Sequence, residues 1–335
     1  MKRRIYPWML VFFLLFFLCP IRAQAAQPEM ENAVWCDPGG WRAFRSAMPW
    51  ETVLCRGTAE LPGDGQQILC CHLTPGLEYV TVTSVKCNGE AVNASLYTIV
   101  TALLDDESAF ALHLSAGAGK RGDQLEIEYT LRLNDKAVAG GEGNWFWLSL
   151  SDENGLVRMG EEGKILTWTT EVYRGIRIPE APGQSNPISG ACLCLYTDPE
   201  LSHRVAFTVR NHDLYLTCAD AGCSHSRHTY VMRTPENGKF RLEGLRAGTY
   251  YLQETRPPDG LTAAAEVQEI TVTEEGTVFS SGILCENGAV SVLYTPSAAE
   301  KIAGHRTLLD YYKAGSRILA AALAFLVATR RYYLY

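Results

Sequence analysis

The sequence lacks the short motifs by which common enzyme classes are recognised. It has no G-x-S-x-G nucleophile elbow, no H-E-x-x-H metal site and no phosphate-binding glycine loop. Five of the seven histidines stand apart from companion acids or nucleophiles: His72, His113, His203, His212 and His305. We therefore expect no enzymatic activity and no cofactor.

A basic excess is also missing. The chain has 30 lysines and arginines against 37 aspartates and glutamates, with no basic block beyond its first four residues. A protein that binds nucleic acid needs clustered positive charge to neutralise phosphates. Nucleic acid is therefore not an expected partner.

The first 25 residues have the layout of a secretory signal peptide. A basic start precedes an apolar run through Leu18, and Ala23-Gln24-Ala25 forms an A-x-A cleavage site. The competing interpretation, a retained anchor, is disfavoured because the run is shorter than a span of roughly 20 residues. We expect cleavage after Ala25 and export of the remaining chain.

Ten cysteines remain after this cleavage. Export permits disulfides, but their connectivity cannot be deduced from the sequence, and in a reducing habitat all ten would stay thiols. The candidate disulfide is the local pair of CADAGC, Cys218 and Cys223. Cys192 and Cys194 share one strand face and need other partners.

The same cysteine loop is also a candidate metal site. Cys218, Cys223, His225 and His228 lie within a dozen residues, and all four are possible zinc ligands. Their spacing is not one of the common zinc-finger spacings, and a disulfide would compete for both sulfurs. We favour a polar loop without metal.

Strands are predicted almost throughout the rest of the chain. Short β-branched or aromatic segments bounded by turn residues recur, and QLEIEYTLRL is the clearest of them. Its alternate apolar residues predict an inward face of Leu125, Ile127, Tyr129, Leu131 and Leu133. Many short strands with frequent turns favour sandwiches over α/β units.

A mature chain of about 310 residues is long enough for two domains of ordinary size. The Pro-, Gly- and Ser-rich stretch 179–190 is a natural boundary between them. The predicted fold class is therefore all-β, with two β-sandwiches in tandem, preceded by a signal helix and followed by a short apolar C-terminal helix.

The strand TYYLQET aims a carboxylate into the protein. Its apolar alternate set is Tyr250, Leu252 and Glu254, so Glu254 is expected to face the core.

Two stretches, PISGACLCLYTD and GKFRLEGLRAGTYYLQETRPPDGL, resemble the prealbumin-like, Cna-B-type domain of SpaA pilins. That family pairs a strand opening with a Gly-Ala step with a later run of turn glycines in fixed register. The matching positions are Gly238, Phe240, Gly244, Leu245, Gly248, Tyr250, Leu252, Glu254, Pro258 and Gly260. The resemblance covers residues 175–297 and implies an Ig-like, prealbumin-like sandwich.

Residues 26–174 resemble the isopeptide-type pilin backbone domain that often precedes the prealbumin-like one. The likeness rests on the strands around TPGLEYVTVTSVKC and GDQLEIEYTLRL, and on NDKAVAGGEGN, which ends at Asn144. It implies a second sandwich, with Asn144 as the candidate acceptor of an isopeptide bond.

In this family a lysine amine attacks an asparagine carboxamide beside a bridging carboxyl group, and ammonia leaves. Burial raises the pKa of a carboxyl group and lowers that of a lysine, which activates the amine. Glu254 occupies the bridging position, but the lysine position falls on Glu180 and the asparagine position on Tyr294. We therefore expect no isopeptide bond in the second domain, and a hydrogen bond from Tyr294 to Glu254 as a substitute.

The first domain also lacks a donor where the family has one. No lysine lies between Lys2 and Lys86, and neither Lys86 nor Lys136 is at the family's lysine position. We hypothesise that disulfides replace the isopeptide bond as the covalent cross-link, since a disulfide contributes roughly 2–4 kcal/mol to the free energy of unfolding.

The strand NWFWLSLS carries Trp145 and Trp147 on one face. These side chains suit either a platform for stacking carbohydrate or a half-buried part of the sandwich core, and we favour the core.

The tail, residues 298–335, contains an apolar segment from Ile318 to Thr329, followed by Arg330 and Arg331. Twelve residues make a helix of roughly 18 Å, shorter than the roughly 30 Å of membrane hydrocarbon. Residues 314–335 together are long enough to anchor in a membrane, and the alternative is a helix packed on protein. No LPxTG-type sorting motif precedes the segment.

These features together predict a pilin-like or adhesin-like protein of a Gram-positive cell surface. Its expected partners are other surface or pilus subunits, host or extracellular ligands, and the membrane through the C-terminal helix. The alternative is a secreted β-sandwich module that binds carbohydrate or protein.

Overall fold

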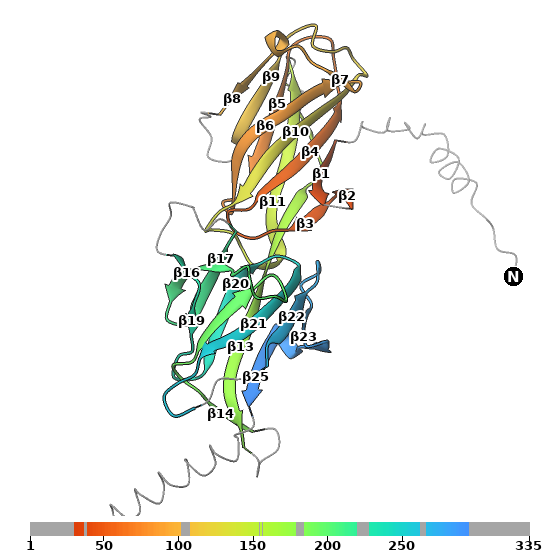
Figure 1. Cartoon of the computed structure of the whole chain (residues 1–335). Helices are drawn as coiled ribbons and strands as arrows, with labels where there is room; N and C mark the ends of the chain where they lie inside the picture. Colours follow the sequence, from red (N-terminus) through yellow and green to blue (C-terminus); the bar gives the residue numbers. More distant parts are fainter. Residues whose placement is uncertain are drawn as a thin grey trace, which may run out of the picture. The chain divides into compact units, whose positions relative to one another are not determined.

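The computed structural model describes residues 30–36, 39–101, 108–153, 155, 157–178, 184–219, 228–261 and 266–294. These residues form 25 strands and two short 3-10 helices, which confirms the predicted all-β fold (Figure 1). The predicted signal peptide, Glu180 and the C-terminal tail lie outside the described part. No helix within that part is long and apolar enough to cross a membrane.

The chain divides into two compact units, and each unit is assembled from stretches that are distant in the sequence. Unit 1 comprises the described residues within Met1–Phe44, Thr52–Arg132 and Asn144–Lys164. Unit 2 comprises the described residues within Arg45–Glu51, Leu133–Gly143 and Ile165–Tyr335. The domain ranges expected from the sequence, 26–174 and 175–297, are continuous and stay a prediction.

Unit 1 is a sandwich of two groups of strands. One sheet has the order β2-β1-β4-β10-β6-β7, and the other group runs β11-β5-β9-β8 with β12 beside β11 (Figure 1). The bounds of the first sheet are β1 Glu31–Cys36, β2 Gly40–Arg42, β4 Thr52–Glu60, β6 Leu77–Cys87, β7 Glu90–Ala91 and β10 Gln124–Leu133. Those of the second are β5 Gln67–Leu73, η1 Ala94–Leu96, β8 Tyr97–Val100, β9 Ser108–Leu114, β11 Gly140–Asp152 and β12 Val157–Met159.

Alternation along β10 forms much of one core face, as the sequence predicts. Each of the five residues expected to point inward is at most 2% exposed: Leu125, Ile127, Tyr129, Leu131 and Leu133. Strand β10 pairs antiparallel with β4 along nine residues, so these apolar side chains line up with the inward residues of β4.

Unit 2 is also a sandwich. One group of strands runs β18-β16-β17-β20-β13, with β3, β14 and β25 also on β13, and the facing sheet runs β19-β15-β21-β22-β23-β24. The bounds of the first are β3 Phe44–Ser46, β13 Gly163–Arg177, β14 Ser185–Pro187, β16 Ala206–Asn211, β17 Leu214–Cys218, β18 His228–Thr229, β20 Lys239–Leu245 and β25 Ala289–Tyr294. Those of the second are β15 Cys192–Tyr196, β19 Met232–Arg233, β21 Gly248–Arg256, β22 Gln268–Val272, β23 Val278–Ser280, β24 Ile283–Leu284 and η2 Glu286–Gly288.

The short stretch Arg45–Glu51 belongs to unit 2, although it precedes most of unit 1 in the sequence. Met48 is 5% exposed and packs in the hydrophobic core with Trp168 and other buried residues. Gly244 has φ +85°, and a Cβ built there would lie 2.8 Å from Cδ of Pro49. A glycine is therefore required where this stretch approaches β20.

Candidate functional site

A buried ion pair lies between the two sheets of unit 2. Glu254 on β21 is 5% exposed, which confirms that this carboxylate points into the core with Leu252. Arg174 on β13 is 1% exposed and shares its strand face with the fully buried Val172. The partner of the inward glutamate is therefore an arginine.

The guanidinium contacts the carboxylate with two nitrogens. Arg174 Nε donates to Oε1 of Glu254 at 3.2 Å, and Nη2 donates to Oε2 at 3.3 Å. Nη1 donates to the carbonyl of Gly175 at 3.0 Å. The planar fork of an arginine matches a carboxylate in this two-pronged geometry. Because either charge alone in this position would be costly, each side chain depends on the other.

The backbone of Arg174 is fixed as firmly as its side chain. Its N–H donates to the carbonyl of Gly238 at 2.8 Å, and its carbonyl accepts from the N–H of Ile188 at 3.0 Å. Gly238 has φ +69°, and a Cβ there would lie 2.5 Å from the Arg174 carbonyl oxygen. The first glycine of the family-like motif thus permits a close approach to the strand that carries Arg174.

The other positions singled out for isopeptide chemistry are only partly described. Glu180 lies outside the described residues, and of Tyr294 only the backbone is described, which pairs with Ile176 in the parallel β13–β25 ladder. The hydrogen bond from Tyr294 to Glu254 therefore stays a prediction. Asn144 lies on β11 and is 1% exposed.

All five lysines of the described part are partly or fully exposed: Lys86, Lys120, Lys136, Lys164 and Lys239. The Nζ of Lys86 lies 3.1 Å from Oε1 of Glu126, and that of Lys164 lies 3.7 Å from the ring centre of Trp145. Trp145 and Asn144 are neighbours in a strand and so point to opposite faces. Lys164 is thus on the face away from the buried amide of Asn144.

Trp145 and Trp147 are half-buried, whereas Phe146 between them is fully buried. The two tryptophans are thus half-buried, as the favoured interpretation expected, and the alternation of β11 turns Phe146 between them fully into the core. Besides the Lys164 ammonium on Trp145, the ring of His72 stacks on Trp147 at 5.2 Å. Both indoles therefore already have a side chain of the same unit against them.

The candidate metal and disulfide loop is cut by the limits of the described part. Cys218 ends β17 and is 4% exposed, and His228 begins β18, while Cys223 and His225 lie outside the described residues. Within the described ranges no group of three or more His, Cys, Asp or Glu side chains is arranged to hold a metal ion. The pairing of Cys218 with Cys223 stays a prediction.

Several thiols in the described part are free: Cys71, Cys87, Cys192 and Cys194. Cys71 is fully buried on β5, and burial raises the pKa of its thiol well above the usual value. Burial likewise raises the pKa of the neighbouring Tyr129 hydroxyl. These groups are held in their neutral forms in the core of unit 1.

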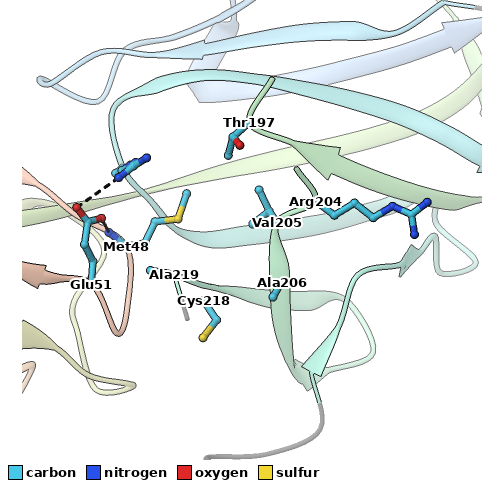
Figure 2. A pocket seen from close by; sticks show the side chains of 9 residues that line it. Met48, Glu51, Thr197, Arg204, Val205, Ala206, Cys218 and Ala219 are labelled. Atoms are coloured by element: carbon cyan, nitrogen blue, oxygen red, sulfur yellow. Dashed lines mark hydrogen bonds and ion pairs between the residues drawn. The ribbon is translucent and has the colours of Figure 1, made fainter. Parts of the chain in front are cut away.

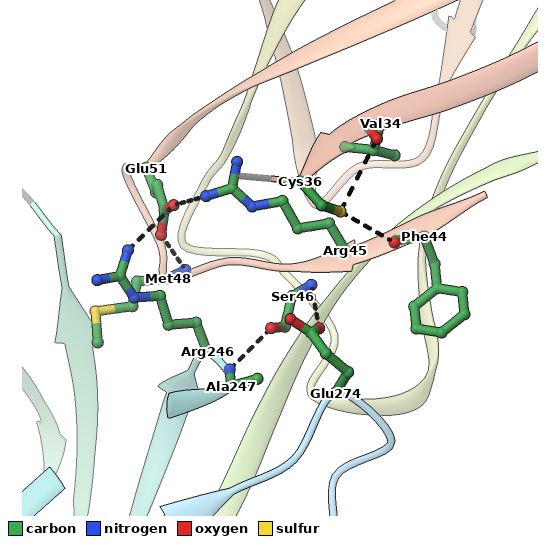
Figure 3. A network of polar contacts seen from close by, with 10 residues as sticks. All are labelled: Val34, Cys36, Phe44, Arg45, Ser46, Met48, Glu51, Arg246, Ala247 and Glu274. Carbon is green, nitrogen blue, oxygen red and sulfur yellow. Dashed lines mark hydrogen bonds and ion pairs between the residues drawn. The ribbon is translucent and has the colours of Figure 1, made fainter. Parts of the chain in front are cut away.

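A polar network attaches Arg45–Glu51 to the rest of unit 2 (Figure 3). The Glu51 carboxylate accepts from Arg45 Nη2 at 2.7 Å, from Arg246 Nη1 at 3.3 Å and from the backbone N–H of Met48 at 3.1 Å. The hydroxyl of Ser46 accepts from the N–H of Ala247 at 2.8 Å. The stretch is thus held by charged hydrogen bonds as well as by its buried methionine.

A pocket of about 370 Å³ adjoins this network (Figure 2). Met48, Val205 and Ala219 provide apolar lining, and Glu51 is neutralised there by its ion pair with Arg246. Thr197, Arg204 and Cys218 complete the lining, so the pocket has polar as well as apolar walls.

Reasoning from the sequence missed Arg174. A signal was present, because Val172, Arg174 and Ile176 follow one another at the two-residue spacing of a strand face. An arginine between two β-branched residues on such a face is either exposed or paired in the core, and the spacing alone does not distinguish the two.

The fold and this site define a protein of two β-sandwich units whose second core is bridged by an ion pair. Residues 183–282 match the family model for SpaA, a prealbumin-like fold domain, within the range where the sequence resembles that family. The sequence matches none of the curated proteins.

Among solved structures the chain is similar to major pilins. GBS80 of Streptococcus agalactiae, a 35 kDa C-terminal fragment, is 16% identical with a TM-score of 0.55, over 79% of this chain and 99% of that one. RrgB of Streptococcus pneumoniae is 13% identical with a TM-score of 0.55, over 81% and 74%. BcpA of Bacillus cereus is 15% identical with a TM-score of 0.51, over 80% and 69%. At these identities the likeness shows the shared fold.

Proposed function

We propose that the chain is a pilin-like structural protein of a Gram-positive cell surface, without enzymatic activity. The observation that carries the proposal is that the likeness to solved pilin structures extends over both units. The likeness to the S. agalactiae pilin covers 79% of this chain, and the SpaA match falls in unit 2. Other surface or pilus subunits are its expected partners, with export by the signal peptide and membrane attachment by residues 298–335.

In this proposal the Arg174–Glu254 pair bridges the two sheets of unit 2 without a covalent bond. Glu254 retains the bridging carboxylate of the family, and the guanidinium of Arg174 forms an ion pair with it. A guanidinium stays protonated in proteins and is not the nucleophilic amine that amide formation needs. All five described lysines are at least partly exposed, which further supports a unit 2 without an isopeptide bond.

The intact mass of the fully reduced mature protein tests this proposal. We expect the mass of the processed sequence, since the loss of one ammonia accompanies each isopeptide bond. The Glu254→Gln variant is the matched control, because it removes the bridging carboxylate that the bond-forming reaction uses. A mass lower by one ammonia in the parent chain but not in the variant would overturn the noncovalent assignment.

Fractionation of expressing cells tests the cellular role. Retention with the membrane or wall supports a surface subunit, and loss of retention on truncation after residue 297 would assign the attachment to the tail. Complete release into the medium would favour a secreted binding module instead.

A further inference from the structure

Another pocket, of about 710 Å³, lies in unit 2. Its walls come from the loop before β15, from the β16–β17 turn with the start of β17, and from β19 with the loop that follows it. The polar side chains that line it include Ser189, His212, Tyr215, Arg233, Glu236 and Asn237. The volume lies within the roughly 300–1,000 Å³ that is usual for sites of small ligands.

Hydrogen bonds fix the walls of this pocket to one another. The hydroxyl of Tyr215 accepts from the N–H of Arg233 at 2.9 Å and donates to the carbonyl of the same residue at 3.2 Å. The N–H of Gly190 donates to the carbonyl of Thr234 at 2.8 Å, and the Thr234 hydroxyl accepts from the N–H of Ala191 at 3.0 Å. The frame of the pocket is therefore formed without a ligand, which lowers the cost of binding one.

The polar side chains of the pocket are not used by the fold. Within the described ranges the guanidinium of Arg233 has no hydrogen bond or ion pair. The same is true there of the side chains of Ser189, His212 and Glu236. The Oδ1 of Asn237 accepts a backbone N–H at 2.9 Å, which leaves its Nδ2 as a donor. The pocket thus offers several donors and one carboxylate acceptor.

The charges of the pocket select the class of ligand. The planar guanidinium of Arg233 matches a carboxylate, which it binds through two parallel hydrogen bonds. A Cβ built on Gly190 would lie 3.7 Å from its Nη2, so at this point the guanidinium has a glycine rather than a side chain beside it. The carboxylate of Glu236 opposes a second negative charge on the ligand and so disfavours a doubly charged phosphate.

The remaining groups are suited to hydroxyls. Glu236 accepts hydrogen bonds from them, whereas Ser189 and Asn237 donate to them. Tyr215 is 5% exposed, so its ring offers little apolar surface to a ligand. We propose that this pocket binds an acidic sugar, a uronic or sialic acid residue, with its carboxylate on Arg233 and its hydroxyls on Glu236 and Asn237. The inference goes beyond the structural role proposed above and does not rest on it.

The test titrates the full chain, in a nonionic detergent, with methyl glucuronide and with methyl sialoside, and follows binding by saturation-transfer NMR. Methyl glucoside has the sugar ring without the charge, and acetate has the charge without the hydroxyls. Inorganic phosphate tests the doubly charged anion. The variants are Arg233→Gln and Glu236→Ala. Arg132→Gln is the matched control, because Arg132 is an arginine of unit 1 whose side chain is 39% exposed.

We expect at least one acidic sugar to bind, and Arg233→Gln to lower its affinity at least about tenfold. Glu236→Ala should weaken binding of the sugar but strengthen binding of acetate, since it removes an acceptor of hydroxyls and a repelling charge together. Arg132→Gln should bind as the parent does, and thermal melting verifies that each variant is folded.

Three results would overturn the proposal: equal binding of methyl glucoside, unchanged binding in Arg233→Gln, or no binding of either acidic sugar up to about 10 mM. Acetate or phosphate that binds as tightly as the sugars would show a simple anion site and overturn the assignment to an acidic sugar. The two sugar acids distinguish a uronic from a sialic acid ligand.

Discussion

Replacing Glu254 by glutamine removes one charge from the core of unit 2 and almost nothing else. The Arg174 and Glu254 side chains are 2% and 0% exposed, so water cannot take over the lost contacts. The change leaves the guanidinium buried opposite a neutral amide, and breaking a buried pair in this way costs about 3–5 kcal/mol. For a unit of this size that corresponds to a fall of about 10 °C in Tm.

The assay is urea unfolding combined with hydrogen exchange of the β15 and β21 peptides, which reports on unit 2 directly. Glu171→Gln is the matched control, because Glu171 pairs with Lys239 at 3.0 Å but the two side chains are 45% and 51% exposed. An exposed pair contributes about 1 kcal/mol or less. If Glu254→Gln destabilises no more than Glu171→Gln, the argument from burial is refuted.

Three further predictions follow from other contacts. Met48→Ala should cost about 2–5 kcal/mol and should speed hydrogen exchange in β21 and β22, because this residue packs in the core of unit 2; acceleration confined to unit 1 would contradict the assignment. Glu51→Gln should cost about 2 kcal/mol in urea unfolding, since two arginines lose a charged acceptor. The pKa of the Cys71 thiol is raised on folding from its reference of 9.0, so stability should be complete below that pH and fall above it; Cys71→Ala should flatten the fall of Tm between about pH 9 and 11.

Local patterns were sufficient to predict the strands and the direction of Glu254. In β10 and β21 the apolar set is distinct from the polar set, and a two-residue period then fixes which side chains are buried. In β11 both alternate sets are apolar or aromatic around Trp145, Phe146 and Trp147, so the period cannot say which set enters the core. The strands that pair with β11 decide which of the two sets is buried.

Two other features depend on contacts between distant parts of the chain. Arg45–Glu51 is held in unit 2 by ion pairs and packing with residues that are distant in the sequence. Glu51, for example, contacts Arg246, which lies 195 positions further along the chain. Arg174 and Glu254 are separated by 80 positions and lie on opposite sheets. The sequence of neither strand indicates which residue its charged side chain will meet, so the pair can be identified only in the folded sandwich.

A buried ion pair adds little net stability compared with apolar residues of equal volume, so its effect is better sought in the alternatives that it excludes. A slip of one residue in its pairing turns every side chain of a strand to the opposite face. A one-residue slip of β13 would carry Arg174 out of the core and leave Glu254 buried without that partner, and a slip of β21 would do the reverse. Each slipped arrangement would bear the cost of a lone buried charge, about 3–5 kcal/mol, which the native register avoids. We therefore expect the pair to favour the native registers of β13 and β21, for which two apolar residues at these positions would offer only their shape. Comparing Glu254→Gln with the double replacement Arg174→Met/Glu254→Leu separates the two effects, because the double variant should recover the stability of unit 2 and still show less uniform hydrogen exchange across β13 and β21.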